Sequence, residues 1–446
     1  MTSSAEPGKK SLVLNAFVEM CSGHQSPGLW RHPDDQSWRF NEISHWVEFA
    51  KLLEEAKFHG IFIADVLGGY DVYQGSLDAA ITSGAQWPVN EPLAAVSAMA
   101  AVTKSIGFGV TVSTTYEQPY HLARRLSTAD HLSGGRLGWN FQVVTSYLDS
   151  AARNMGCTAQ PQHDDRYAQA EEYMRVMYKL FESSWRDDAV QRDAARGVYT
   201  DPKLVRRIDH AGPFFTSGKQ FAAQHAEAVF VSAHAPAVCA ASIAEIRQAA
   251  AIKVLALVTP ILGTTEAEAQ QKLAEYRQYA SHDGAVWGGG RESILSRYGD
   301  EEELREVESN AVRSTVTGYA KFSSGTKKWT EHTIAEHVSI GGNGPVLVGT
   351  PLQVADGLQT WVDEADVDAF NFAYALFPQS FKNIIELLLQ ELRRRGLFWD
   401  DYAVPGGTYR ENLYREPGLK RSPPDHLSAK FRWQAGVSTE DHPVPQ

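Results

Sequence analysis

The chain has 446 residues, of which 43% are hydrophobic and 22% charged, a composition typical of a globular protein with a large apolar core. Its 54 acidic side chains outnumber the 42 basic ones and give a formal charge of −12. This excess of acid argues against nucleic acid or an anionic membrane as a partner, because both are bound through basic patches.

The cysteines and the N-terminus point to a reduced, cytoplasmic protein. Cys21, Cys157 and Cys239 are far apart and form no CxxC pair, so neither a disulfide scaffold nor a zinc site is predicted. Two lysines stand beside a short apolar run at the N-terminus, unlike the long apolar segment of a signal peptide. Because no stretch approaches eighteen consecutive apolar residues, no membrane span is expected.

Strand-like apolar runs alternate with amphipathic helices along the chain. Strands are predicted at 11–19, 60–66, 106–114, 136–146, 228–233, 252–262 and 370–377. Helices are predicted at 45–58, 92–104, 121–132, 165–182 and 381–396. This alternation predicts an α/β fold with a parallel sheet, either open and doubly wound or closed as a barrel.

Two observations favour the (β/α)8 TIM barrel. The first strand is not followed by GxGxxG, and polar residues come directly after several different strands. In a barrel such positions converge on one mouth, at the carboxyl ends of the strands, where active sites lie. An open sheet would spread them out.

The predicted barrel domain covers residues 1–405 and is interrupted by two insertions. Residues 183–216 and 282–350 are rich in Gly, Ser and charge, and we expect them to lie over the barrel mouth. The tail at 406–446 is polar and contains several prolines, so we expect an arm that runs over the surface or contacts another subunit.

Several kinds of chemistry are poorly supported. His163, Asp164 and Asp165 form the closest approach to a metal cluster, but HExxH and paired Cys/His spacings are absent, so no metal site is predicted. A hydrolase on the same barrel is disfavoured because no GxSxG nucleophile motif occurs. Neither IGFGVTV nor GGNGPVLVG completes a dinucleotide fingerprint, so the chain shows no site for NAD(P)H.

The segments after the strands are polar and aromatic instead, which suits a planar heteroaromatic cofactor with a phosphate tail. The candidate residues are Cys21, His24, Asp65, Tyr70, Gln86, Thr114, Asn140, Ser146, Tyr147, His163 and Tyr167. Each type of residue also has a structural use: Asp65 as a helix cap, Asn140 as a turn former, and Cys21 as an inert buried thiol.

Long segments of the chain resemble the bacterial-luciferase-like, FMN-dependent monooxygenases. The similar branch contains the nitrilotriacetate, dibenzothiophene-sulfone and long-chain-alkane monooxygenases. The segments that carry the resemblance lie at 15–33, 62–73, 113–140, 163–174, 219–230, 348–356 and 407–414. They extend over nearly the whole chain, and such a set of segments is far more specific than any single short motif.

The resemblance implies a (β/α)8 barrel, a homo-oligomer (dimer or tetramer), and reduced FMN bound at the carboxyl ends of the strands. It also implies a separate NAD(P)H-dependent flavin reductase, which agrees with the missing nicotinamide fingerprint. The expected reaction inserts one oxygen atom of O2 into an apolar, sulfur-containing or nitrogen-containing substrate, through a C4a-(hydro)peroxyflavin. The protein must keep that intermediate away from water.

The resemblance also assigns roles by position. Asp65 would contact the isoalloxazine edge, Thr114 and Asn140 would line its pocket, and Ser146, His163 and Tyr167 would serve the ribityl-phosphate end. Cys21, His24, Tyr70 and Gln86 match pocket positions near the reacting face, where His24 or Tyr70 would donate a proton. Tyr147 stands where the alkane enzymes carry a histidine, which implies a change in the substrate pocket.

The sequence departs from the family at two places in the barrel wall. WNFQVVTS contains about two extra residues before Ser146, which predicts a bulge or a shifted phosphate serine. After GPFFT, roughly two dozen residues that include the fifth barrel strand and a phosphate-binding serine are expected to be missing, and barrel closure depends on strand number. Ser217 is one substitute for that serine, and His282 is the nearest candidate for the family's histidine before the lid glycines.

Two interpretations follow. The first is an active oxygenase component of a two-component flavin monooxygenase. The second is a flavin-binding or structural relative whose catalysis is impaired because the fifth strand and its phosphate serine are missing. The junction at 212–220 is the feature that separates them.

Overall fold

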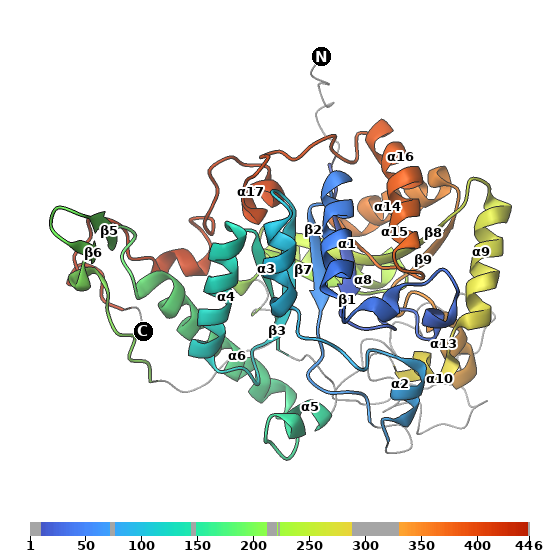
Figure 1. The fold of residues 1–446 in the computed structure, drawn as a ribbon, viewed down its shortest axis with the longest axis horizontal. Helices are drawn as coiled ribbons and strands as arrows, with labels where there is room; N and C mark the ends of the chain where they lie inside the picture. Colours follow the sequence, from blue (N-terminus) through green and yellow to red (C-terminus); the bar gives the residue numbers. More distant parts are fainter. Residues whose placement is uncertain are drawn as a thin grey trace.

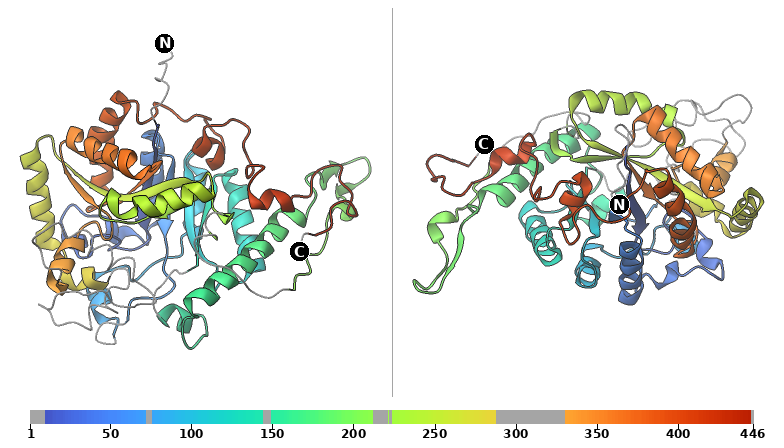
Figure 2. Two further views of the ribbon diagram at one scale, coloured as in Figure 1. Left: turned by 180° about the vertical axis from the view of Figure 1, so that it is seen from behind. Right: turned by 90° about the horizontal axis from the view of Figure 1, so that it is seen from above.

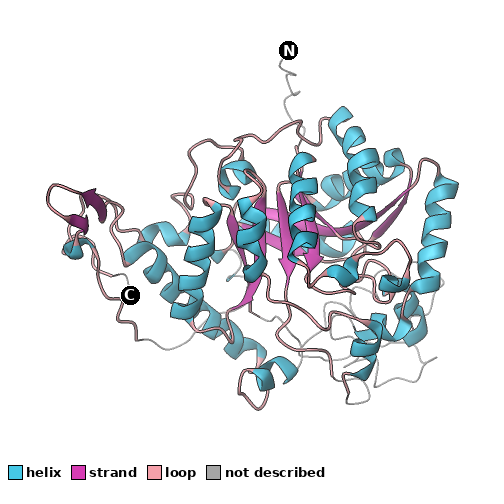
Figure 3. Ribbon diagram, in the orientation of Figure 1, coloured by secondary structure: helices cyan, strands magenta, loops and turns pink. Residues whose placement is uncertain are grey.

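A computed structural model describes residues 10–71, 76–143, 149–211, 221, 224–287 and 330–444 of the chain. Its centre is one parallel sheet, with helices packed around it (Figure 1, Figure 3). The strands follow one another in the order β4 (Leu137–Gln142), β3 (Gly107–Ser113), β2 (Gly60–Ala64), β1 (Val13–Glu19), β10 (Ala369–Phe372), β8 (Lys253–Leu262) and β7 (Ala228–Val231). A further strand, β9 (Val346–Gly349), pairs with the carboxyl-terminal half of β8.

The helices connect successive strands and cover the outside of the sheet. The longer ones are α1 (Ile43–Glu55), α3 (Leu93–Ala101), α4 (Pro119–Ser133), α6 (His163–Tyr178), α8 (Pro236–Ala249), α9 (Glu266–Tyr279), α13 (Glu331–Val338) and α14 (Pro351–Ala365). Shorter ones are α2 (Asp78–Ser83), α5 (Asp149–Asn154), α10 (His282–Trp287), α15 (Gln379–Asn383), α16 (Leu389–Arg394) and α17 (Tyr409–Tyr414). Within the described residues, no helix is both long and apolar enough to cross a membrane.

Alternation along β1 separates the two faces of the sheet, as the period of a strand requires. Val13 and Phe17 belong to small interior clusters with residues of β8, whereas Leu14, Ala16 and Val18 join the main core that packs against the helices. Every residue of β1 is buried, as expected for a central strand covered on both faces. By the same alternation Glu19, the last residue of β1, lies on the inward face.

The sheet curves into a barrel. Phe230 on β7 lies 5.3 Å from Phe17 on β1 and 5.6 Å from Phe62 on β2, measured between ring centroids. In the sheet order β7 and β2 are well separated, so these aromatic contacts must cross the interior. The predicted α/β barrel class is therefore confirmed, and the interior is packed with side chains as in other barrels of this kind.

The barrel wall is incomplete among the described residues. β4 pairs only with β3, and β7 pairs only with β8, so these two strands are the edges of the sheet. The structure describes no strand between them among the residues that it covers, and the loss of the fifth barrel strand stays a prediction. Residues 212–220, where the deletion was predicted, lie outside the described residues, and so does Ser217.

A tyrosine from the C-terminal segment fills the end of the barrel opposite the mouth. A Cβ atom added at Gly60 would lie 2.7 Å from the Tyr409 hydroxyl, one at Gly138 would lie 3.0 Å from its ring, and one at Gly107 would overlap that ring. The Tyr409 hydroxyl donates a hydrogen bond of 3.2 Å to Asn15 Oδ1. Glycines on three adjacent strands thus make room for one aromatic ring. The C-terminal segment that carries this ring runs over the same end of the molecule (Figure 2).

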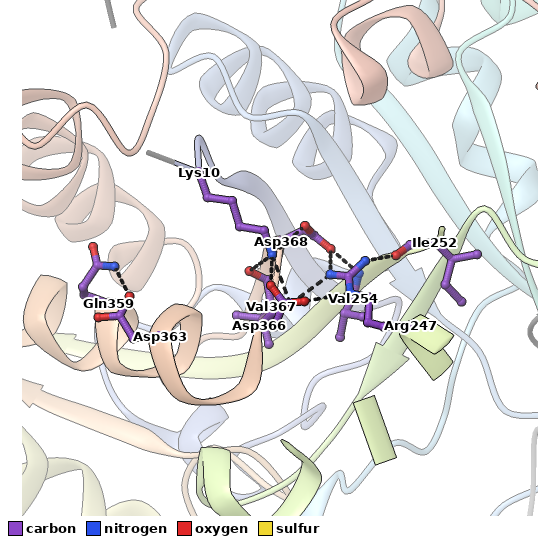
Figure 4. A network of polar contacts seen from close by, with 9 residues as sticks. All are labelled: Lys10, Arg247, Ile252, Val254, Gln359, Asp363, Asp366, Val367 and Asp368. Carbon is purple, nitrogen blue, oxygen red and sulfur yellow. Dashed lines mark hydrogen bonds and ion pairs between the residues drawn. The ribbon is translucent and has the colours of Figure 1, made fainter. Parts of the chain in front are cut away.

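Charged residues join the first strand, the last strand and α8 at the same end of the barrel (Figure 4). Asp366 accepts hydrogen bonds from Lys10 Nζ at 2.5 Å and from Arg247 Nε at 3.0 Å. Asp368 is 3.0 Å from Lys10, contacts Arg247, and accepts a hydrogen bond of 2.8 Å from the Val254 amide. Burial opposes ionisation of Asp368, but these donors outweigh it and lower its pKa.

The two predicted insertions lie in different parts of the molecule. In the first, β5 (Val190–Asp193) and β6 (Val198–Thr200) form an antiparallel hairpin that projects from the side of the molecule, beside the C-terminal tail (Figure 1). Asp187 ties this segment to Arg421 at 2.5 Å and to Arg432 at 2.9 Å. In the second, the Gly341 amide donates to Ser26 Oγ at 3.3 Å, next to the segment that follows β1. The division into a barrel domain and a C-terminal arm stays a prediction.

Most predicted strands and helices are present, with shifted ends. The predicted strand 136–146 ends at Gln142 and pairs with β3 without a register shift, so any extra residues come after the strand; Ser146 lies outside the described residues. The predicted strand 370–377 is too long, because β10 ends at Phe372. Beyond it, the Ala375 and Leu376 amides donate to Ser380 Oγ instead of to a neighbouring strand.

Candidate active site

Glu19 is the centre of a polar cluster at the barrel mouth. Its carboxyl group has no exposed area, and its Oε2 atom accepts a hydrogen bond of 2.7 Å from Gln86 Nε2. The Cys21 thiol donates to the same oxygen at 3.6 Å, and His24 Nε2 stands 3.9 Å from it. Three side chains from two later segments, Cys21, His24 and Gln86, therefore meet around the carboxyl group of Glu19.

The aromatic layer of the barrel supports this cluster from below. The His24 ring packs edge-on against Phe17, with ring centroids 4.5 Å apart, and Tyr374 lies 6.4 Å away on another side. Phe17 belongs to the interior cluster with Phe62 and Leu257. The polar groups thus pack against a layer of apolar side chains, which holds them at the barrel mouth.

Burial controls the ionisation of the cluster. It raises the pKa of Glu19 to about 7, although hydrogen bonds from Gln86 and Cys21 act in the opposite direction. It lowers the pKa of His24 to about 3, so that imidazole is neutral near pH 7. Burial, followed by the nearby Glu19, holds the pKa of Cys21 well above its usual range, which keeps the thiol protonated and weakly nucleophilic.

Asp65 follows β2 and carries a second acid to the same mouth. Burial and then the neighbouring Glu19 raise its pKa to about 8. Glu91 and Glu117 raise it further, and only the Val66 amide acts against them. Two acids that stay partly protonated near neutral pH, in one mouth, are the kind of perturbed groups that mark functional sites.

The predicted pocket residues on the other side of the sheet contact neighbouring strands. Asn140 Nδ2 donates to Thr111 Oγ1 at 2.9 Å, and both side chains share the inward face of β3 and β4. The Thr114 amide donates to the Gln142 carbonyl at 2.9 Å, and its hydroxyl contacts the same oxygen at 3.4 Å. Thr114 therefore helps to anchor the end of β4, and its hydroxyl oxygen can still accept a hydrogen bond.

His163 and Tyr167 lie together at the N-terminus of α6. Their ring centroids are 4.8 Å apart, as expected for residues four positions apart in a helix. Half of the His163 side chain is exposed and its Nδ1 atom is 2.9 Å from Asp164, while Tyr167 is half-buried and packs against Phe221. A helix N-terminus favours an anionic group, but Asp164 and Asp165 already lie in this first turn, and the phosphate role of this end stays a prediction.

The structure says less about the remaining predicted residues. Tyr70 is buried, 5% exposed, in the segment that follows β2. Ser146 and Tyr147 lie outside the described residues. The structure thus brings Cys21, His24 and Gln86 into one cluster, and His163 and Tyr167 into another.

Several buried polar atoms in this region have no hydrogen-bond partner within the described residues. They are Glu19 Oε1, both ring nitrogens of His24, the Tyr116 hydroxyl after β3, and Ser150 Oγ in α5. Buried polar atoms are almost always paired in folded proteins, so this set indicates a bound polar molecule or water. Their mixture of donors and acceptors fits a flavin. No group of three metal-ligating side chains occurs in the described part of the chain.

A family model described as luciferase-like monooxygenase matches residues 18–368, which is more than half of the chain. The chain belongs to the luciferase-like monooxygenase family. The predicted family and the predicted enzyme class, a monooxygenase, are both confirmed.

Named relatives of this luciferase-like monooxygenase align over almost its whole length. Dimethyl-sulfide monooxygenase from Hyphomicrobium sulfonivorans is 42% identical over 95% of this chain and 94% of its own. Long-chain alkane monooxygenase from Geobacillus thermodenitrificans is 40% identical over 95% of this chain and 98% of its own. A crystal structure of riboflavin lyase with modified FMN and riboflavin has a TM-score of 0.83 and 31% identity, covering 95% and 100% of the two chains.

Sequence reasoning missed the residue on which the cluster of this luciferase-like monooxygenase is centred. Cys21, His24 and Gln86 were predicted, but Glu19 was taken only as the end of a strand. A signal was present, because Glu19 continues the inward alternation of Val13, Asn15 and Phe17 to the carboxyl end of β1. An acid at that position of a barrel strand points at the mouth.

Proposed function

We propose that this chain is the oxygenase component of a two-component flavin monooxygenase. It would take reduced FMN from a separate NAD(P)H-dependent flavin reductase and use O2 to insert one oxygen atom into an apolar, sulfur-containing or nitrogen-containing organic substrate. When bound, the flavin supplies the activation of O2, through the C4a-(hydro)peroxide that the family resemblance implies. A cytoplasmic location and a homo-oligomeric state are parts of the same proposal.

The observation that carries the proposal is the set of partly protonated acids and unpartnered polar atoms at the mouth of a luciferase-like barrel. Such groups bind the edge of a planar heterocycle and hold protons next to it. The absence of a dinucleotide fingerprint in the sequence supports the need for a partner that oxidises NAD(P)H. The FMN-related ligand in the riboflavin lyase structure supports the choice of flavin.

Each part of the site would have its own task. Asp65 would bind the edge of the isoalloxazine ring, with Thr114 and Asn140 beside it, and the N-terminus of α6 with His163 and Tyr167 would bind the phosphate. The apolar layer under Glu19 and His24 would exclude water from the reacting face. His24 is neutral at pH 7 and would donate a hydrogen bond without releasing a proton.

The decisive experiment adds reduced FMN to the purified protein under anaerobic conditions and measures binding by the change in flavin fluorescence. O2 is then admitted, and the absorbance of a long-lived oxygenated flavin and the release of H2O2 are followed. We expect saturable binding and a long-lived adduct. A folded protein that does not bind reduced FMN would contradict the proposed function.

One observation favours a second candidate, a flavin-binding relative with impaired catalysis. Within the part of the chain that the structure describes, the sheet has two free edges, β4 and β7, where a complete barrel would have none. In that case reduced FMN would bind, but O2 would be converted to H2O2 without a long-lived adduct. The same experiment therefore separates the two candidates.

The roles assigned to Asp65 and Cys21 give a direct comparison. Asp65→Ala removes a carboxyl group proposed to contact the flavin and should weaken FMN binding by about tenfold, the usual effect of losing one hydrogen bond. Cys21→Ala removes only a thiol that donates to Glu19 and should change FMN affinity little. Equal FMN affinities in the two variants, measured by fluorescence titration, would contradict these roles.

A further inference from the structure

Glu19 is a fully buried acid to which the proposed function gives no task of its own. Its Oε2 atom accepts hydrogen bonds from Gln86 and Cys21, whereas its Oε1 atom has no partner within the described residues. Both ring nitrogens of the neighbouring His24 also lack a partner. His24 Nε2 is 3.9 Å from Glu19 Oε2, beyond hydrogen-bonding distance. Three unpaired polar atoms therefore lie next to one another at the carboxyl end of β1.

We propose that Glu19 presents a protonated Oε1 atom to the substrate, and that it selects neutral substrates that carry a hydrogen-bond-accepting oxygen, such as sulfones, sulfoxides and amides. This inference rests on the proposed function, because it takes the barrel mouth as the place where the substrate binds. It narrows the substrate class from any apolar or heteroatom-containing molecule to one with a defined polar group.

The hydrogen bonds of Glu19 decide where its proton lies. A neutral carboxyl group has one oxygen that only accepts and one that carries the proton. Because Oε2 already accepts from two donors, the proton belongs on Oε1. Neutral His24 supplies one further donor and one acceptor. The cluster thus offers two donors toward a ligand, which match the two oxygens of a sulfone or the lone pairs of an amide carbonyl.

The same groups disfavour two other classes of substrate. An alkane would leave all three buried polar atoms without partners, at about 1–3 kcal/mol for each atom. An anionic substrate would be disfavoured, because Glu91 and Glu117 act electrostatically at this mouth, where they raise the pKa of Asp65. Burial raises the pKa of Glu19, and only hydrogen bonds from Gln86 and Cys21 lower it. No cation in the described structure lowers this pKa.

The titratable groups around Glu19 come from three segments: Cys21 and His24 after β1, Asp65 after β2, and Tyr374 after β10. Burial raises the pKa values of Cys21 and Tyr374 well above their usual ranges, so both keep their protons from pH 5 to 9. Burial lowers the pKa of His24 to about 3, so it stays neutral over that range. Only Glu19 and Asp65 change charge between pH 5 and 9.

The test uses two probes with the same five-membered ring, sulfolane, which has two sulfone oxygens, and tetrahydrothiophene, which has none. Binding of each probe is measured by titration calorimetry on the full-length protein, with and without oxidised FMN so that no turnover occurs. In the wild type, sulfolane should bind about tenfold more tightly at pH 6 than at pH 8.5, because the ionised carboxylate repels the sulfone. Tetrahydrothiophene binding should not depend on pH.

Three variants isolate the contribution of Glu19. Glu19→Gln keeps a donor but cannot ionise, so its affinity for sulfolane should be the same at pH 6 and 8.5. Glu19→Leu should lose about tenfold in sulfolane affinity at pH 6 and keep or gain affinity for tetrahydrothiophene. Asp65→Asn, the matched control, should retain the pH dependence of the wild type, because Glu19 still titrates.

The proposal is overturned if Glu19→Leu binds sulfolane as tightly as the wild type does, or if the pH dependence disappears in Asp65→Asn and persists in Glu19→Gln. Equal affinity of the wild type for both probes would mean that water satisfies the three atoms, and would also overturn it. Anaerobic titration of the same protein with reduced FMN distinguishes a failure of the proposed function from a failure of the inference about Glu19. A wild type that fails to bind reduced FMN refutes the proposed function, whereas sulfolane binding to the flavin-free protein still reports on Glu19.

Discussion

At the scale of single residues, Glu19 ties the stability of the protein to pH. Burial raises its pKa from an ordinary value of 4.5 to about 7, so the folded chain binds a proton that the unfolded chain has released between these values. Its contribution to stability is therefore complete below pH 4.5 and is lost as the pH rises through 7. At about 1.4 kcal/mol per pKa unit, the loss amounts to at most about 3 kcal/mol.

Glu19→Gln should remove this dependence. The free energy of unfolding of the variant minus that of the wild type should increase by up to about 3 kcal/mol between pH 4.5 and pH 8, measured by urea denaturation. His24 titrates in the opposite sense at low pH, but it does so in both proteins and cancels from the difference. A difference that does not change with pH would show that Glu19 is already ionised at pH 5.

The cysteines differ in reactivity because their environments differ. Cys157 is exposed, whereas burial and the adjacent Glu19 hold the pKa of the Cys21 thiol far above its usual range. Since only the thiolate reacts, iodoacetamide at pH 8 should alkylate Cys21 at least about 100-fold more slowly than Cys157. Mass spectrometry of the digested protein measures both rates, and labelling in urea is the control. Equal rates in the native protein would support the catalytic role predicted for Cys21.

Residue identities explain why the candidate site was only partly predictable. Cys21, His24 and Gln86 are polar residues in segments that follow strands, so the sequence points to them directly. Glu19 was not predicted, because its role depends on the face of the strand and on Gln86, which is 67 positions away in the sequence. Contacts between distant segments are set by the fold, and no local pattern encodes them.

At the scale of elements, α17 is held by its first residue. Tyr409 occupies a space that exists because Gly60, Gly107 and Gly138 have no side chains. Tyr409→Ala should leave a void in the barrel end and lower the free energy of unfolding by about 3–4 kcal/mol, the usual effect of removing a large aromatic side chain from a packed site.

Two matched variants control this experiment. Tyr409→Phe loses only the hydrogen bond to Asn15 and should lose about 1 kcal/mol. Tyr199→Ala removes a tyrosine that is 70% exposed on β6 and should change stability by less than about 0.5 kcal/mol. If Tyr409→Ala were as stable as Tyr199→Ala, the C-terminal segment would not support the barrel.

Elements were predicted best where periodicity and buried apolar residues agree. β1 and β8 were placed within two residues of their observed ends. The hairpin of β5 and β6 was not predicted, because its strands are short and none of their residues is buried. The end of β10 was overestimated, because Ser380, not a neighbouring strand, accepts from the amides that follow.

At the scale of the whole molecule, the edges of the sheet should be visible in the protection of the backbone. Among the described residues, β1 and β10 are paired on both sides at the centre of the sheet, whereas β4 and β7 are paired on one side only. Edge strands open more easily, so hydrogen exchange in β4 and β7 should be at least about tenfold faster than in β1 and β10, as measured by mass spectrometry. Equal protection would mean that another segment pairs with these edges.

The architecture was predictable at this scale for a simple reason. Repeated strand–helix alternation restricts the topology to a few parallel folds, and polar residues after several strands select the barrel. The prediction of a missing strand rests only on the family resemblance, since no local pattern within the chain indicates it. The sideways path of the hairpin was not predictable, because it depends on ion pairs such as Asp187 with Arg421.

The position of Tyr409 also bears on the order of events during synthesis. A ribosome makes the chain from its N-terminus, so every barrel strand is complete before Tyr409 emerges. Until then the space between Gly60, Gly107 and Gly138 has no occupant from the chain itself. The end of the barrel opposite the mouth is therefore filled only when nearly the last segment of the protein has been made. A chain that stops after β10 would contain every strand of the described sheet but would lack the side chain that fills this end.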